Sequence, residues 1–293
     1  MILIDGKYTA SCIREELRGV IDLRIQQGKS VPGLALLLVG DNPASAVYVG
    51  GKDKACKEIG MHSTILRLPS STSEETVLNI LDTWNSSPEI HGILVQLPLP
   101  KHIDEQRVLM AIDPKKDVDG FHPENVGRVS LGLPGFLPCT PAGIVELLKR
   151  YNVPTRGRHA VVVGRSNIVG KPMASLLMRK GEGGDAIVTV CHSAAADLRT
   201  YTKQADILIA AVGVPHLIGA DDVKDGVVVI DVGMNRIADP SRSGGTRLVG
   251  DVDFDVVAPR CAAITPVPGG VGPMTIAMLL RNTLTAAENG DTE

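Results

Sequence analysis

A tyrosine and a lysine four positions apart are the first residues whose types and spacing could support chemistry. Tyr48 and Lys52 lie in a segment with helical character, so this spacing places both side chains on one helix face. A lysine amine can transfer protons to and from a bound substrate, although ordinary amphipathic helices often carry such a pair. Gly50 and Gly51, between them, each cost a helix about 1 kcal/mol relative to Ala. Close approach of a flat ligand or of another backbone would explain them, and so would fraying.

Polar residues in two later segments could hold a ligand. Gln96 ends an apolar segment, and the carboxyl ends of strands are where open α/β sheets bind ligands. Asp113, Asp117 and Asp119 lie beside a turn at Gly120, but they lack the further spaced ligands and the terminal Glu of a calcium loop, so no metal site is predicted. A carboxylate can instead accept two parallel hydrogen bonds from an amidine-like edge, such as that of a pterin or a guanine.

Residues 265–275 contain three glycines and three prolines. A stiff backbone without bulky side chains lets a ligand approach closely. A tight linker between domains would have the same composition, and both interpretations are compatible.

The second half of the chain contains a sequence pattern that is typical of dinucleotide-binding sites. The apolar strand predicted over 159–164 runs into a turn with Gly164 and Gly170, followed by a helix. This glycine spacing departs from Gly-x-Gly-x-x-Gly and is weak evidence by itself. Residues 190–193, where an NAD site usually has an acid, contain none, whereas Arg165 in the turn suits a phosphate. The pattern therefore favours NADP over NAD, unless Arg165 is simply a solvated loop charge. For His192, a surface imidazole is the simplest interpretation.

The composition is that of a globular α/β protein. The 293 residues predict about two domains, and 44% of them are hydrophobic against 22% charged. The formal charge of −3, without blocks of like charge, argues against nucleic-acid binding. The five scattered cysteines form no Cys-x-x-Cys pair, so neither disulfides nor zinc are expected. Without a signal-peptide pattern or an apolar run of ~20 residues, the chain is expected to be cytoplasmic.

Strand and helix patterns alternate along the chain, which predicts an α/β fold with parallel sheets covered on both faces. A rise in Pro and Gly between 113 and 141 predicts a domain boundary. Residues 239–245 are predicted to form an exposed loop tip, and residues 289–293 a frayed tail. Strands are predicted over 33–40, 64–68, 91–96, 159–164, 186–191, 206–212 and 227–231, and helices over 9–27, 44–59, 73–84, 142–151, 168–180 and 273–288.

Several longer motifs occur in an order found in one family. They are Tyr48-x3-Lys52, Val95-Gln-Leu-Pro-Leu-Pro100, Lys116-Asp-Val-Asp-Gly120, Pro138-Cys-Thr-Pro141, Gly164-Arg-Ser-x2-Val-Gly-x-Pro172 and Pro266-Val-Pro-Gly-Gly-Val-Gly-Pro273. The sequence resembles, over essentially its whole length, the bifunctional methylene-tetrahydrofolate dehydrogenase/methenyl-tetrahydrofolate cyclohydrolase family. The glycines at 50–51 and the length of the 239–245 loop depart from the family's usual pattern.

The resemblance implies two three-layer α/β domains around a cleft, with a homodimer built through the cofactor domains. A folate-binding catalytic domain would span 1–141, completed by the helix over 273–288, and a Rossmann-like NADP-binding domain would span 142–272. Lys52 would be the catalytic residue, supported by Gln96 and by Tyr48 stacked on the folate. The remaining implied positions are Asp119, Pro268, Gly269 and Gly270 for the substrate, and Gly164, Arg165, Ser166, Ser193 and Met234 for the cofactor.

The implied reactions belong to one-carbon metabolism: NADP-dependent oxidation of methylene-tetrahydrofolate to methenyl-tetrahydrofolate, then hydrolysis to formyl-tetrahydrofolate. Three alternatives stay open on the residues alone. A dehydrogenase-only member would result if the helix with two glycines no longer held Lys52 usefully. A non-catalytic folate or NADP sensor could retain the same pocket. An unrelated NADP dehydrogenase acting on a keto acid would account for the second half of the chain but not for the first.

Overall fold

The computed structural model describes residues 1–241 and 244–291, which fold into two compact units. We name them after their parallel sheets, the three-stranded unit and the six-stranded unit. The six-stranded unit comprises Met1–Ala10, Val129–Leu133 and Thr140–Thr275, and the three-stranded unit comprises Ser11–Arg128, Pro134–Cys139 and the chain from Ile276 on. Among the described residues, no helix is long and apolar enough to cross a membrane.

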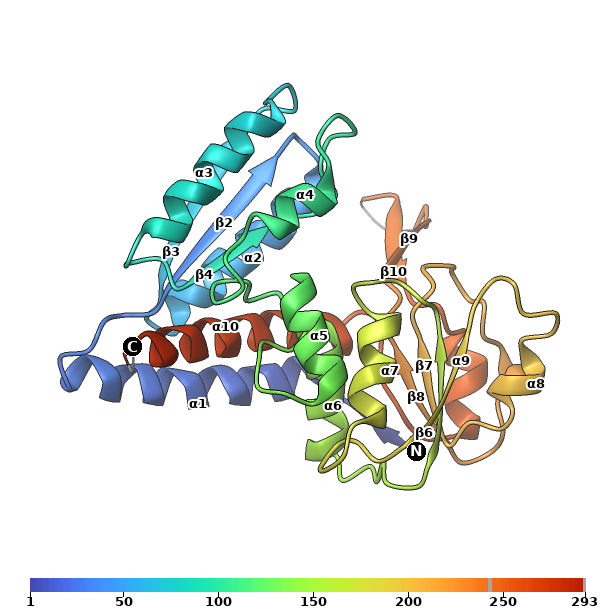
Figure 1. Cartoon of the computed structure of the whole chain (residues 1–293). Helices are drawn as coiled ribbons and strands as arrows, with labels where there is room; N and C mark the ends of the chain where they lie inside the picture. Colours follow the sequence, from blue (N-terminus) through green and yellow to red (C-terminus); the bar gives the residue numbers. More distant parts are fainter. Residues whose placement is uncertain (242–243, 292–293) are drawn as a thin grey trace. The chain divides into compact units, whose positions relative to one another are not determined.

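The three-stranded unit is built on a parallel sheet in the order β3-β2-β4 (Figure 1). Its central strand β2 (Gly33–Val39) is entirely apolar and buried, with β3 (His62–Leu68) and β4 (Gly92–Val95) on either side. Helix α3 (Glu74–Ser86) places Trp84 in the core between the sheet and the helix. Because both neighbours of β2 run parallel to it, all three strands end at the same edge of the sheet.

Helices in this unit begin where the sequence supplies an N-cap. The Asn42 side chain accepts hydrogen bonds from the backbone N–H groups of Ala44 and Ser45 and so starts α2 (Pro43–Glu58), which packs on β2 and β3. Asp104 caps α4 (Glu105–Met110) in the same way. These caps fix the first turn of each helix and hence the direction in which later side chains point.

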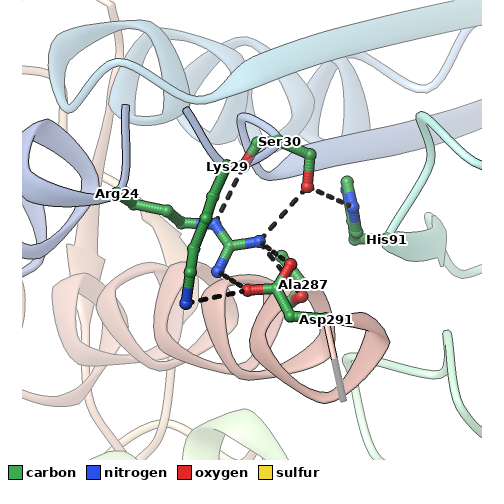
Figure 2. Close-up of polar contacts among 6 residues, drawn as sticks. All are labelled: Arg24, Lys29, Ser30, His91, Ala287 and Asp291. Carbon is green, nitrogen blue, oxygen red and sulfur yellow. Dashed lines mark hydrogen bonds and ion pairs between the residues drawn. The ribbon is translucent and has the colours of Figure 1, made fainter. Parts of the chain in front are cut away.

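Helices α1 (Gly6–Gln26) and α10 (Val271–Gly290) are joined by polar contacts near their C-terminal ends (Figure 2), so the predicted frayed tail is wrong for residues 289–291. The Arg24 guanidinium is 4% exposed and donates to both Asp291 carboxylate oxygens, at 2.6 and 2.8 Å. It also donates to the carbonyl oxygens of Ser30 (2.8 Å) and Ala287 (3.1 Å). All three nitrogens of this planar fork therefore donate to acceptors, which lets Arg24 be buried.

The six-stranded unit is a parallel sheet in the order β1-β11-β8-β7-β5-β6 (Figure 1). Its core is aliphatic, because the inner strands are almost wholly buried and rich in Val, Ile and Ala. The strands are β1 (Ile2–Leu3), β5 (His159–Val163), β6 (Ile187–Cys191), β7 (Ile207–Ala210), β8 (Val227–Asp231) and β11 (Cys261–Ile264). The remaining α-helices of the described chain are α5 (Pro123–Leu131), α6 (Cys139–Arg150), α7 (Gly170–Met178), α8 (Arg199–Thr202) and α9 (Phe254–Val257).

The predicted α/β class with parallel sheets is confirmed, and each predicted strand and helix is present within a few residues. The shorter elements are not predicted by the sequence pattern: α4, α5, α8, α9, β1, β11 and the hairpin of β9 (Asn235–Ala238) and β10 (Thr246–Val249). The segment expected as a loop tip joins β9 to β10, and its residues 242–243 lie outside the described residues. The cysteines form no disulfide, as expected.

Candidate active site

The Lys52 amine is the centre of a polar cluster in the three-stranded unit. Helix α2 carries Lys52, whose side chain is 8% exposed. Its Nζ donates a hydrogen bond of 3.1 Å to Oε1 of Gln96. A lysine buried to this extent loses most of its hydration, so the amide oxygen is a necessary partner rather than an incidental contact. The structure therefore brings together two residues that are 44 positions apart in the sequence.

Gln96 is held in one orientation. It follows β4, and its backbone N–H donates to the carbonyl of Leu37 on the neighbouring strand at 2.8 Å. Its side-chain Nε2 donates to the carbonyl of Leu97 at 2.7 Å. Because the carbonyl of Leu97 can only accept, the amide nitrogen is directed there and the amide oxygen is turned toward Lys52.

Asp119 lies close enough to Lys52 for the two charges to interact. Burial raises the pKa of Asp119, while the positive charge of Lys52 and the thiol of Cys139 act in the opposite direction. The Cys139 thiol also donates to the carbonyl of Val118 at 3.3 Å, and burial raises the pKa of this thiol well above its usual range. Lys52, Gln96, Asp119 and Cys139 thus form one cluster, and Cys139 is a member that was not predicted as a site residue.

Asp117 anchors the turn that carries Asp119. One of its carboxylate oxygens accepts from the backbone N–H of His122 at 2.8 Å and from Nδ2 of Asn125 at 2.9 Å, and the other accepts from the N–H of Phe121 at 3.2 Å. Burial raises the pKa of Asp117 to about 6, against the opposing effect of these hydrogen bonds. The side chain is directed into the turn, so its role is structural. Among the described residues, no group of three or more His, Cys, Asp or Glu could hold a metal.

Tyr48 lies one turn before Lys52 on α2, and Gly50 and Gly51 lie between them. Tyr48 is 41% exposed. A Cβ added at Gly50 would meet no atom within 4 Å in the described structure, and one at Gly51 would meet only the end of the Ile276 side chain at 3.8 Å. The suggestion that a neighbouring backbone requires these glycines is therefore wrong. Space for a ligand remains an explanation for them.

In the six-stranded unit, the predicted cofactor turn connects β5 to α7. A Cβ on Gly164 would lie 2.2 Å from the carbonyl oxygen of Ala211, and one on Gly170 would lie 2.3 Å from that of Gly164. Gly164 is thus required by the backbone that follows β7, and Gly170 by the turn itself. Oγ of Ser166 accepts from the backbone N–H groups of Val169 (3.1 Å) and Gly170 (3.3 Å), which orders the N-terminus of α7. Helix N-termini of this kind favour bound anions.

The other predicted cofactor residues follow neighbouring strands of this sheet. Arg165 and Ser193 are exposed, and Ser193 follows β6, whose end carries no carboxylate. Met234 follows β8 and is 41% exposed. It lines a shallow hollow together with Asp231 and residues 266–272, which include Pro268, Gly269 and Gly270. An exposed guanidinium and an exposed hydroxyl are the kinds of group that can bind a phosphate of a dinucleotide.

These features define a class of protein. A parallel sheet whose first strand–helix turn is glycine-rich, with the order β6-β5-β7-β8 around it, is the arrangement of dinucleotide-binding α/β proteins. Residues 4–119 match the catalytic domain, and residues 138–291 the NAD(P)-binding domain, of tetrahydrofolate dehydrogenase/cyclohydrolase. The chain belongs to the tetrahydrofolate dehydrogenase/cyclohydrolase family.

Individual relatives agree with this assignment over almost the whole chain. The chain is 60% identical to the bifunctional protein FolD of Chlorobium phaeobacteroides, covering 97% of each chain. It is 49% identical to the bifunctional FolD of Campylobacter jejuni, with a TM-score of 0.93 and 99% of each chain covered. The methylenetetrahydrofolate dehydrogenase-cyclohydrolase of Trypanosoma brucei, solved with NADP cofactor and an inhibitor, is 40% identical with a TM-score of 0.95, covering 100% of this chain and 99% of that one.

Proposed function

We propose that this protein oxidises methylene-tetrahydrofolate to methenyl-tetrahydrofolate with NADP and then hydrolyses the product to formyl-tetrahydrofolate. The observation that carries the proposal is the buried Lys52 amine, hydrogen-bonded to an oriented Gln96 amide and near the Asp119 carboxylate. The oxidation also requires a hydride acceptor, and the turn between β5 and α7 of the same chain would bind the dinucleotide that provides it.

In the oxidation, the chain's residues mainly position the substrate. Asp119 would accept hydrogen bonds from the pterin edge, and Tyr48 would stack on the folate. When bound, NADP supplies the hydride acceptor. Expulsion of the hydride needs no strong base, because the lone pair of the folate nitrogen stabilises the methenyl cation as it forms. Holding the substrate in a reactive geometry is therefore most of what the protein contributes to this step.

In the hydrolysis, Lys52 would move protons. Water adds to the methenyl carbon, a bond between that carbon and one folate nitrogen breaks, and one proton is released overall. In its neutral form, the Lys52 amine would take a proton from the attacking water and then give one to the departing nitrogen. The hydroxyl of the adduct would release the second water proton as the formyl carbonyl forms. Gln96 accepts a hydrogen bond from Lys52, so it would fix where the amine lies during both transfers.

The cofactor site would be formed by the turn after β5 and by the ends of β6 and β8. Gly164 and Ser166 would hold the pyrophosphate near the N-terminus of α7, and Arg165 with Ser193 would hold the additional phosphate of NADP. Met234 would lie near the far ribose or the nicotinamide. In this proposal, residues 1–141 with 273–288 bind folate, and residues 142–272 bind NADP. The protein would be a cytoplasmic homodimer.

A coupled assay tests the proposal. The full-length protein is mixed with methylene-tetrahydrofolate and either NADP or NAD, and the reduced cofactor and the methenyl intermediate are followed by absorbance. We expect reduced cofactor to form faster with NADP, followed by decay of the intermediate. An intermediate that accumulates and decays only at the uncatalysed rate would indicate a dehydrogenase-only protein. Tight folate binding without any cofactor-dependent change would indicate a sensor, and either result would overturn the proposed pair of reactions.

A further inference from the structure

Two buried carboxylates in the six-stranded unit are held by N–H groups. Asp231 is 4% exposed and Asp251 is 0% exposed. Asp251 Oδ2 accepts from the backbone N–H groups of Val212 (2.7 Å) and Gly213 (3.0 Å), and its Oδ1 accepts from Nδ2 of Asn235 at 2.9 Å. No salt bridge to either carboxylate is found in the described part of the chain.

Asp231 makes a complementary set of contacts. Its Oδ1 accepts from the backbone N–H groups of Gly233 and Asp251, both at 2.9 Å, and its Oδ2 accepts from the N–H of Val252 at 3.0 Å. Asp231 therefore holds the segment that carries Asp251, and Asp251 in turn holds the segment after β7. The position of the segment after β7 therefore depends on both carboxylates.

Two glycines make this arrangement possible. A Cβ on Gly250 would lie 1.7 Å from Oδ2 of Asp231, and a Cβ on Gly233 would lie 2.3 Å from Oδ1 of Asp251. Any larger residue at either position would displace a carboxylate. Both glycines and both carboxylates thus serve one local geometry.

The segments held by these carboxylates follow the carboxyl ends of β7 and β8. Val212 and Gly213 follow β7, and Gly233 and Met234 follow β8. In a doubly wound sheet, a dinucleotide binds across the carboxyl ends of the strands, with its pyrophosphate at the first glycine turn, here the one after β5. One nucleotide half then lies toward β6, and the other lies toward β7 and β8. The segments held by the two carboxylates are those that face this second half.

We propose that Asp231 and Asp251 are positioning residues for cofactor binding, which hold the segments after β7 and β8 in the shape that receives the nicotinamide half of NADP. This inference rests on the proposed function, since it takes NADP as the ligand. Neither carboxylate needs to touch the cofactor. Their effect passes through the backbone of residues 212–213 and 233–234, because the carboxylates are themselves directed into the protein.

Two substitutions at one position separate positioning from general stability. Asp251→Ala removes both acceptors, which frees the N–H groups of Val212 and Gly213. Asp251→Asn keeps one carbonyl oxygen for these N–H groups, and its new amide nitrogen can donate to the Asn235 side chain once that amide turns over. Asp206→Ala is the matched control: Asp206 holds the N–H of His159 (2.9 Å) and the amine of Lys224 at the opposite end of the same sheet.

The measurements are NADPH binding by fluorescence titration, the NADP KM of the dehydrogenase, and the cyclohydrolase rate without NADP. For Asp251→Ala we expect the NADPH Kd and the NADP KM to rise roughly tenfold or more, with a much smaller effect on hydrolysis. For Asp251→Asn and Asp206→Ala we expect Kd and KM within about threefold of the parent protein. Hydrogen exchange of the peptide covering 212–213 should accelerate in Asp251→Ala alone.

Three results would overturn the inference: unchanged NADPH binding in Asp251→Ala, an equal loss in Asp206→Ala, or an equal loss of dehydrogenase and hydrolysis in Asp251→Ala. Failure of the inference differs from failure of the proposed function. If the parent protein binds NADPH and reduces NADP while Asp251→Ala does the same, only the inference fails. If the parent protein neither binds NADPH nor reduces NADP, the proposed function itself fails.

Discussion

Replacing Asp231 by Asn should remove a pH dependence from the stability of the six-stranded unit. Burial raises the pKa of Asp231 from its ordinary 3.8 to about 6, with three backbone N–H groups acting in the opposite direction and the charge of Asp251 in the same direction. The folded protein therefore binds this proton more tightly than the unfolded chain does. The resulting stabilisation is fully present below about pH 4 and is lost as the pH rises through 6.

The difference between the two pKa values, at 1.4 kcal/mol per pKa unit, gives a total of roughly 3 kcal/mol. Of this, about 1.4 kcal/mol should be present at pH 5 and almost none at pH 7. Asp231→Asn cannot take up the proton. Asp117, whose pKa burial also raises to about 6, is unchanged in the variant, so its contribution cancels when the two proteins are compared.

The assay must report on the six-stranded unit. The only tryptophan, Trp84, lies in α3 of the other unit, so fluorescence is not suitable. Hydrogen exchange of peptides covering β7 and β8, corrected for intrinsic rates, gives the opening free energy directly. The parent protein should gain about 1.4 kcal/mol over the variant between pH 7 and pH 5. A difference that stays constant over this range, or that shrinks on acidification, would refute the reasoning.

Two further predictions concern other charged groups. Arg24→Ala leaves the carbonyl oxygens of Ser30 and Ala287 without their donor, which should lower the free energy of unfolding by about 1–3 kcal/mol. Denaturant unfolding followed by Trp84 fluorescence measures this change. The half-exposed Lys29, which pairs with the same Asp291, should be replaceable by Ala with little change, and an equal loss in both variants would contradict the role assigned to Arg24. Arg165→Ala should raise the KM for NADP roughly tenfold or more and that for NAD far less. Arg158→Ala, at the other end of β5, is its control, and equal losses with both cofactors would exclude the phosphate role.

The sequence predicted the long elements because their apolar patterns are continuous. Strand β2 is seven apolar or glycine residues long and buried throughout, so its pattern is unambiguous. Strand β11 is only four residues long, and β1 has two exposed residues whose partner lies about 260 positions away. Short strands of this kind depend on tertiary pairing rather than on local pattern, and sequence periodicity does not reveal them.

The residues of the candidate site likewise include some that the sequence predicts and some that depend on tertiary packing. Lys52, Gln96 and Asp119 were selected by spacing, by strand ends and by family motifs, and the structure brings them together in one cluster. The contribution of Cys139 was missed because it depends on the packing of a thiol against Asp119 and Val118, which no local pattern encodes. Asp251 was missed for a similar reason, since its partners at 212, 213 and 235 are distant in the sequence.

The most direct test of the account compares two rates in one variant, Lys52→Met. General acid–base catalysis by one positioned group is typically worth 10²–10⁴-fold. Hydrolysis of methenyl-tetrahydrofolate should therefore fall roughly a hundredfold or more, while NADPH formation from methylene-tetrahydrofolate stays measurable and the methenyl intermediate accumulates. Lys54→Met is the control, because Lys54 lies on the same helix and is 78% exposed. Hydrolysis at the parental rate in Lys52→Met would contradict the account.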